Sequence, residues 1–187
     1  MRKSIFSIFF MVICMAMFGV LQHAQAQYFT TSTGVVTFFS KTPVEDISAI
    51  HKTASSVINT TNNQIVVQMT MKQFTFPNAL MQEHFNENYM ESEKYPMATF
   101  SGKINEKIDF TKSGTYPVTA TGKMKIHGVE QDKNFSGTLI ITGDKMNLKT
   151  EFEIALVDYK IDVPKIVFAK IAEKIQVKIN FDYTLKK

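Results

Sequence analysis

Apolar and polar side chains alternate along most of the chain. Successive side chains of a β-strand point to opposite faces, so this pattern predicts strands that each have one dry face and one wet face. The stretches with this alternation are residues 65–71, 98–104, 118–126, 135–141, 146–156 and 175–183. Strands of this kind pair in antiparallel sheets, and they close into a barrel or pack as a sandwich.

Weaker signals predict two more strands near the N-terminus, one around Val36 and Phe38 and one over residues 49–59. Residues 41–47 and 60–63 contain proline, threonine and asparagine and are typical of turns. The total is about eight strands. The wet faces carry lysine and glutamate, which rules out a barrel embedded in lipid. We therefore expect a water-soluble, mainly β protein whose dry faces point inward.

Residues 80–89 break the alternation. Leu80, Met81, His84, Phe85 and Tyr89 recur at helical spacing, which predicts an amphipathic helix of about three turns. Asn78, directly before it, is a favourable N-cap residue. The apolar stripe of this helix either plugs a packed core or covers the mouth of a cavity. A weaker stripe predicts a second short helix around residues 165–173.

Several small residues fall on the predicted dry faces, where they leave volume to be filled. Empty volume is costly inside a protein, so either large neighbours or a ligand must occupy it. The small residues are Ala98, Gly102, Ala120, Gly122 and Gly137, and the large neighbours are Phe100, Phe135, Phe152 and Phe181. A barrel of about eight strands is just wide enough to hold one small molecule.

The N-terminus has the pattern of a cleaved secretory signal. Arg2 and Lys3 precede an apolar run over residues 5–21, and Ala24-Gln25-Ala26 is a cleavage site of the A-x-A type. The sequence thus predicts a signal peptide over residues 1–26, one domain over 27–187, and a periplasmic or secreted protein that does not span the membrane after cleavage. Cys14, the only cysteine, lies inside the signal, so we expect neither disulfides nor thiol chemistry.

The charges of the mature chain argue against nucleic-acid binding. Removing Arg2 and Lys3 lowers the formal net charge from +4 to +2. Arg2 is the only arginine of the sequence, so bidentate recognition of phosphate or guanine is not available. No basic cluster takes its place.

No catalytic or metal-binding motif stands out. His51, His84 and His127 lie far apart in the sequence without ligand spacing. Asp158 and Asp162 offer two carboxylates for acid–base chemistry, but they read more simply as surface charges in a loop. No nucleophile–base pair can be named. We therefore expect no catalytic residues, no metal, no cofactor and no enzymatic activity.

Two segments resemble the YceI-like family. The stretch HFNENYMESEKYPMATFSGKI (residues 84–104) has the Tyr-Pro pair at Tyr95 and Pro96 and a Thr-Phe-Ser strand at 99–101, and GKMKIHGVEQD (residues 122–132) ends a strand in a Gly-Val turn. The resemblance covers nearly all of residues 28–187. It implies a lipocalin-like antiparallel barrel that binds a long isoprenoid chain, such as a quinone tail or polyprenyl lipid, in its interior.

The chain also departs from this family. Thr33-Gly34 stands where members often have His-Ser, and Leu156 stands where they often have an arginine before an Asp-aromatic pair, here Asp158-Tyr159. The missing polar groups bear on recognition of a head group. Binding of the apolar tail depends only on the dry faces.

The sequence thus favours an exported binding protein that transports or stores an isoprenoid lipid. Its alternative is a cell-envelope interaction or stress-response module with a packed core and no lipid. The sequence leaves open whether the protein forms a homodimer. In the first hypothesis Met81 and Phe85 form a lid, and the tail contacts Phe100, Ala120, Gly122, Met124, Ile126, Phe135, Leu139, Phe152, Ile154, Ile179 and Phe181.

Overall fold

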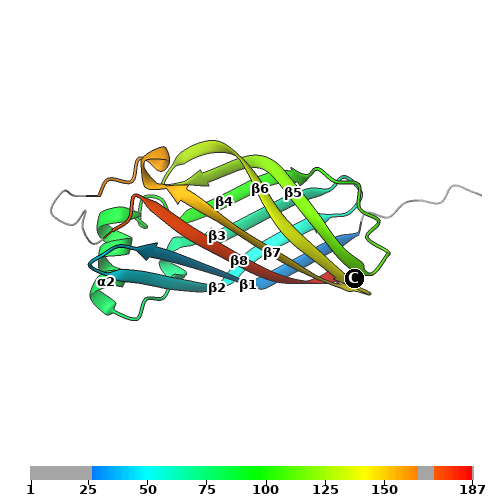
Figure 1. The fold of residues 1–187 in the computed structure, drawn as a ribbon, viewed down its shortest axis with the longest axis horizontal. Helices are drawn as coiled ribbons and strands as arrows, with labels where there is room; N and C mark the ends of the chain where they lie inside the picture. The colour runs from blue at the N-terminus through cyan, green and yellow to red at the C-terminus, as the bar shows by residue number, and fades with distance from the viewer. Residues whose placement is uncertain (1–26, 164–170, 187) are drawn as a thin grey trace, which may run out of the picture.

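Eight antiparallel strands form a closed barrel in the computed structural model, which describes residues 27–163 and 171–186 (Figure 1). Each strand pairs with the next along the chain, and the last pairs with the first. The strands are β1 (Tyr28–Lys41), β2 (Asp46–Asn59), β3 (Gln64–Thr70), β4 (Met97–Ile104), β5 (Gly114–Ile126), β6 (Val129–Thr142), β7 (Lys145–Ala155) and β8 (Lys174–Lys186). The predicted lipocalin-like fold of about eight strands is confirmed.

Every stretch of alternating residues lies in a strand, with its apolar positions inward, except that Met71 and Leu156 come directly after the ends of β3 and β7. The strands extend further than the pattern indicated, most of all at β1, which begins at Tyr28 rather than near Val36. The residues 30–33 of β1 are all threonine or serine and show no alternation. They join the sheet because Phe29, which is 3% exposed, is buried in the core and pairs with Ile58 of β2.

Tight turns connect most of the strands. His127 and Gly128, with φ of 50° and 75°, form the turn between β5 and β6, as the sequence suggested, and Ile126 pairs directly with Val129 across it. Glycine is required at 128 for two reasons. Its φ is positive, and a Cβ atom there would overlap the ring of Tyr95.

The connection from β3 to β4 carries the predicted helix. It runs through a short 3₁₀ turn, η1 (Met71–Gln73), to helix α2 (Ala79–His84), which continues as the π-helical turn η2 (Phe85–Tyr89). No helix in the described ranges has the length and apolarity needed to cross a bilayer. The predicted second helix over 165–173 lies mostly outside the described residues, and residues 171–173 at its end are not helical.

The two ends of the barrel differ in their packing. We name the end opposite α2 the closed end (Figure 1). Side chains with exposed fractions of 2% or less fill it. They include Ile58, Leu139, Ile141, Met146 and Tyr183. At the end covered by α2, the open end, many inward side chains are only partly buried, among them Met81, Phe85, Phe135 and Phe152.

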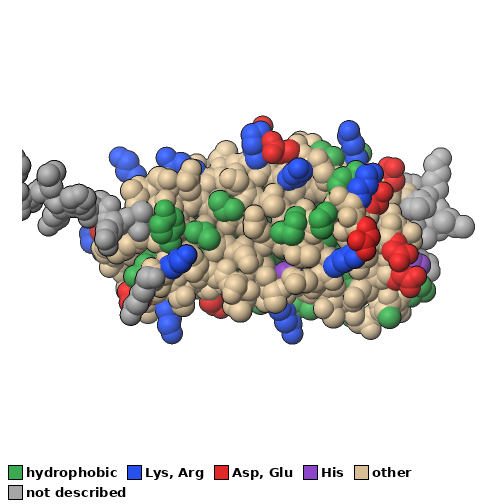
Figure 2. Space-filling model, turned by 180° about the vertical axis from the view of Figure 1, so that it is seen from behind, with side chains coloured by type: hydrophobic (Ala, Val, Ile, Leu, Met, Phe, Trp, Pro, Cys, Tyr) green, Lys and Arg blue, Asp and Glu red, His purple; other side chains and the backbone are tan. Residues whose placement is uncertain are grey.

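The outer face of the barrel is polar. Figure 2 shows lysine and acidic side chains distributed over the reverse face, with small and separate hydrophobic spots between them. Cross-strand ion pairs such as Lys178–Glu151 and Lys123–Glu130 lie on this outer surface. This distribution agrees with the inward orientation of the dry faces.

Candidate functional site

A cavity of about 450 Å³ occupies the open end of the barrel. Strands from all around the barrel line it, together with α2, η2 and the residues on both sides of η1. Nearly all the lining side chains are aliphatic, aromatic or methionine. The volume falls in the range of small-molecule sites, and the scarcity of polar groups suits an apolar ligand rather than a polar one.

The mouth of this cavity lies beside α2. Asn78, Leu80 and His84 are exposed and line the cavity, and Glu45 of the β1–β2 turn lies there as well. Asn78 caps the helix as predicted, because its Oδ1 accepts hydrogen bonds from the backbone N–H groups of Leu80 (2.8 Å) and Met81 (3.4 Å). The helix therefore covers a cavity and is not a plug in a solid core.

Four phenylalanines hold the helix on the barrel. Phe85 of η2 packs against Phe38 of β1 at a centroid distance of 5.5 Å, against Phe76 at 5.0 Å and against Phe74 at 5.7 Å. Phe38 also contacts Phe74 and Phe76 directly. Each aromatic contact of this kind contributes about 0.5–1.5 kcal/mol beyond its buried area. The predicted lid residue Phe85 thus lies in the most densely aromatic part of the site.

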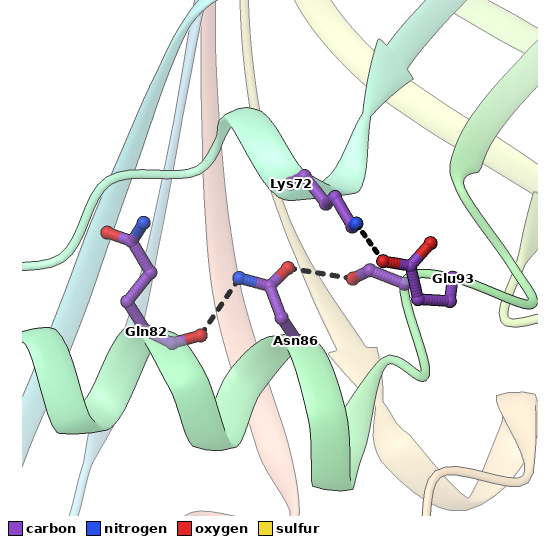
Figure 3. Close-up of polar contacts among 5 residues, drawn as sticks. Lys72, Gln82, Asn86 and Glu93 are labelled. Atoms are coloured by element: carbon purple, nitrogen blue, oxygen red, sulfur yellow. Dashed lines mark hydrogen bonds and ion pairs between the residues drawn. The ribbon is translucent and has the colours of Figure 1, made fainter.

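A polar network fixes the C-terminal part of the helix (Figure 3). The Asn86 side chain donates to the Gln82 carbonyl (2.9 Å), and its Oδ1 accepts from the hydroxyl of buried Ser92 (2.8 Å). Nearby, Lys72 of η1 forms an ion pair with Glu93. The exposed ion pair adds little stability, whereas the Asn86–Ser92 contact orders the chain as it leaves the helix.

A second row of aromatic rings crosses the interior. Phe135 of β6 lies 5.3 Å from Phe100 of β4 and 4.2 Å from Phe152 of β7, measured between ring centroids. All three rings line the cavity. They form one continuous aromatic part of its lining.

The small inward residues play different roles from the one expected. The space beside Gly102 is taken by the ring of Phe100, and a similar space at Gly34 by the ring of Phe181. Gly122 and Gly137 lie so close to a neighbouring strand that a Cβ atom would meet the carbonyl oxygens of Ser101 and Lys149, respectively. The hollow is therefore not the space that the missing side chains of these glycines leave. Of the five small residues, Ala98, Ala120 and Gly137 line it.

Eleven of the predicted contact residues line the cavity: Met81, Phe85, Phe100, Ala120, Met124, Ile126, Phe135, Phe152, Ile154, Ile179 and Phe181. The other two do not. Leu139 is fully buried in the closed end, where it pairs with Leu148. Gly122 pairs with Gly102 at a close approach of two backbones and contributes no surface to the hollow.

Sequence reasoning missed the part of the lining that comes from the β1–β2 side and from the segment before the helix. The missed residues include Phe38, Ile47, Met69, Met71, Phe74 and Phe76. The sequence around Phe74 and Phe76 (QFTFP) has a period of two, which was a usable signal for two inward rings. It was overlooked because the segment is too short to form a strand, with only an isolated bridge between Thr75 and Ile50.

Of the buried polar side chains of the described residues, Ser40 lines the cavity, whereas His51, Ser56 and Ser92 do not. His51 is fully buried, and its Nδ1 accepts a hydrogen bond from the Thr53 amide (3.2 Å). Burial lowers the pKa of His51, which favours the neutral ring. Burial also raises the pKa of Tyr159 to about 12, with the neighbouring carboxylate of Asp158 as a second cause.

The histidines do not converge. His51 lies on β2, His84 on α2, and His127 in the β5–β6 turn, where its Nε2 contacts a Glu91 oxygen at 2.9 Å and its Nδ1 lies 3.1 Å from the Tyr159 carbonyl. Among residues 27–163 and 171–186, no three histidine or acidic side chains gather as a metal site would require. His127 instead ties the end of η2 to the β5–β6 turn.

An antiparallel eight-stranded barrel with one inserted helix and an apolar interior is the lipocalin-like type of architecture. The sequence of residues 16–183 matches the YceI-like domain, and the chain belongs to the YceI-like family. A search of curated proteins found no match.

Solved structures share this fold at low sequence identity. A polyisoprenoid-binding domain from Saccharophagus degradans, described as implicated in plant cell wall breakdown, aligns with a TM-score of 0.75 and 12% identity over 87% of this chain and 100% of its own. BcnA of Burkholderia cenocepacia aligns with a TM-score of 0.66 and 15% identity, over 80% and 95% of the two chains. A mutant YceI protein of Campylobacter jejuni gives 0.59 and 20%, over 74% and 84%.

Proposed function

We propose that this protein is an exported, non-enzymatic binding protein that holds the isoprenoid chain of a quinone or polyprenyl lipid in the cavity of its open end. The observation that carries the proposal is the hollow itself, which is apolar along its length and opens to solvent beside α2. The S. degradans domain, which is described as polyisoprenoid-binding and has the same fold, supports the ligand class.

Binding of the tail would come mainly from burial of apolar surface. Each Å² removed from water contributes about 25 cal/mol, less the cost of ordering a flexible chain. The rings of Phe100, Phe135 and Phe152 would contact the chain at the deep end of the cavity, and Met81 and Phe85 would cover it at the mouth. The head group would lie near Glu45 and His84.

The signal pattern at residues 1–26 supports an exported protein, and the polar outer face supports a carrier that moves in water. In the periplasm or outside the cell such a carrier transports or stores a lipid that is insoluble by itself. The proposal thus includes a bound lipid as the ligand and no cofactor.

Native mass spectrometry of the mature protein, purified from its own host, tests the proposal. We expect an adduct that extracts into organic solvent and has the mass of an isoprenoid lipid. A clean apo mass, together with no uptake of added long-chain isoprenoid quinone, would instead support an envelope module without lipid.

A bulky substitution in the lining provides the matched control. Ala120→Phe places a ring in the cavity and should abolish uptake, whereas Thr121→Phe, on the exposed face of the same strand, should leave uptake intact. If Ala120→Phe fails to fold, Ile179→Trp on β8 tests the same space. Gly122→Phe is unsuitable, because its side chain would meet the backbone of β4 rather than the cavity.

A further inference from the structure

The pairing of β6 with β7 stops halfway along the two strands. Backbone partners run from Thr142↔Lys145 to Gly137↔Thr150 and no further. Beyond that point β6 pairs only with β5, and β7 pairs only with β8. Residues 129–136 and 151–155, all of them described, therefore face each other without backbone pairing, and we name this opening the β6–β7 gap. Figure 1 shows the two strands spreading apart toward the open end.

A second interruption, between β2 and β3, is sealed by backbone. Pairing there ends at Ser55↔Gln68. The chain after β3 then crosses the opening, and Ile50 and Thr75 exchange two backbone hydrogen bonds of 3.0 and 2.8 Å. The ring of Phe74 packs on His51 at this seal. The β6–β7 gap has no comparable strap among the described residues.

Two aromatic side chains close the β6–β7 gap. Phe135 comes from one flank and Phe152 from the other, and their ring centroids lie 4.2 Å apart. Both rings are only partly buried, and both line the cavity. At the end of the gap that is nearest the closed end, the Thr150 hydroxyl donates to the Ser136 carbonyl (2.6 Å). Exposed Ser136 and inward Thr150 both line the cavity, so the hollow reaches the barrel wall here.

At the other end of the gap, nearest the open end of the barrel, the 3₁₀ turn η3 (Leu156–Tyr159) follows β7 and contacts β6. The Lys133 ammonium lies 3.1 Å from a carboxylate oxygen of Asp158, and the Gln131 side chain donates to the Asp158 carbonyl (2.9 Å). The side chains of Lys133 and Asp158 are 26% and 42% exposed. A partly exposed ion pair of this kind breaks easily.

We infer that the β6–β7 gap is a lateral opening through which the apolar chain of the ligand enters and leaves the cavity. Phe135 and Phe152 are its movable rings, and the Lys133–Asp158 ion pair is its clasp. The inference rests on the proposed function, because it concerns the route to the same cavity.

The alternative route is the mouth beside α2, where Phe85 packs on three other rings. Widening this mouth requires Phe85 to separate from Phe38, Phe74 and Phe76. Opening the lateral route requires the rotation of Phe135 and Phe152 and the release of the side-chain contacts at the two ends of the gap, but no backbone–backbone hydrogen bond between the two flanks has to break. A head group can therefore remain near the mouth while the long chain slides in sideways.

Exchange kinetics test the route with a long-chain isoprenoid quinone, followed through quenching of tyrosine fluorescence. Asp158→Asn opens the clasp but keeps the backbone carbonyl that Gln131 contacts. We expect its association and dissociation rates to rise together, by about two- to fivefold, as loss of a weak ion pair allows, with the equilibrium Kd unchanged. Unchanged rates, or a rise in the dissociation rate alone with a matching rise in Kd, would show that Asp158 only shapes the cavity, and would overturn the inference.

Cross-linking provides the converse experiment, because the predicted mature chain has no cysteine. A short bis-maleimide across Lys133→Cys and Asp158→Cys should slow exchange at least tenfold. The same reagent across Thr53→Cys and Gln73→Cys, whose native side chains meet at 2.8 Å on the sealed β2–β3 side, should leave the rates unchanged. Equal rates in both cross-linked proteins would overturn the inference.

The outcomes also separate this inference from the proposed function. If no variant binds the quinone at any time, the proposed function fails. If all variants bind it but exchange is stopped by cross-linking Glu45→Cys to Leu80→Cys, both of which line the cavity at its mouth, only the lateral route fails. A doubled mass for Asp158→Asn in native mass spectrometry would assign the unpaired strand edges to pairing between two copies of the chain, and would likewise overturn the route.

Discussion

The two ends of the barrel are built from the same eight strands but differ in what the inward side chains meet. At the closed end Leu139, Ile141 and Tyr183 have exposed fractions of 0–2% and belong to the hydrophobic core cluster. At the open end Phe135, Phe152 and Met124 are partly buried and border empty space. Tight packing and empty space therefore lie at opposite ends of a single sheet.

A buried hydrogen-bond chain strengthens the closed end. The Tyr183 hydroxyl donates to Ser56 Oγ (2.8 Å), and Ser56 donates to the Val66 carbonyl (2.8 Å). Every polar atom in this chain has a partner, which is what a water-free interior requires. Burial raises the pKa of Tyr183, so the phenol stays neutral and remains a donor throughout the usual pH range. The open end has aromatic stacking instead, which tolerates small shifts of the rings.

The largest expected effect comes from truncating one side chain at each end. Leu139→Ala leaves a cavity in a filled region and should lower the free energy of unfolding by about 2–5 kcal/mol. Met124→Ala removes a side chain that already borders empty space, so it loses fewer contacts and should cost only about 1 kcal/mol. Urea denaturation of both variants measures the difference. Equal losses would mean that the open end is as tightly packed as the closed end.

The strands of this fold could be predicted because most of them have one dry face, which appears in the sequence as an alternation of apolar and polar residues. The sequence predicted a barrel but not the strand pairing that closes it, since the pairing of β1 with β8 depends on contacts between the two ends of the chain. The helix was also predictable, because its stripe and its cap at Asn78 are local features.

The lining of the cavity could be predicted only in part. Alternation places Leu139 and Phe135 on the same inward face, yet one lies in the packed end and the other in the hollow. Depth along the barrel depends on strand register, which a single strand does not reveal. The glycines were misinterpreted for a related reason. The space beside Gly102 is filled by the ring of Phe100 from its own strand, and the space beside Gly122 by the backbone of the neighbouring strand β4.

A smaller, pH-dependent effect should come from His51 beside the open end. Burial lowers its pKa in the folded protein, so below about pH 6.5, the ordinary value, the unfolded chain binds the proton more readily than the folded one. The free energy of unfolding should therefore be unaffected by His51 at higher pH and should fall as the pH drops below that value, by at most about 1.4 kcal/mol per pH unit.

His51→Leu isolates this contribution. Denaturant midpoints measured from pH 8 down to pH 5, a range of about three units around the ordinary pKa, should decline less steeply in the variant than in the wild type. Parallel curves would show that His51 takes up its proton without cost, and that the seal between β2 and β3 is more open to water than its burial indicates.

The smallest expected effect tests whether contacts with the barrel stabilise the helix or whether the helix is only loosely attached at the open end. Asn78→Ala removes the cap from the amides of Leu80 and Met81 and should cost about 1 kcal/mol of helix stability. Because Phe85 anchors the helix in the four-phenylalanine cluster, the first turn should fray while the rest of the helix stays in place. Hydrogen exchange at those two amides should then speed up about fivefold, with the closed-end amides unchanged.

Asn88→Ala, at an exposed position of η2, serves as the control. If exchange accelerates over the whole of α2 and η2, the helix moves as a unit, and the mouth rather than the barrel wall becomes the easier way into the cavity.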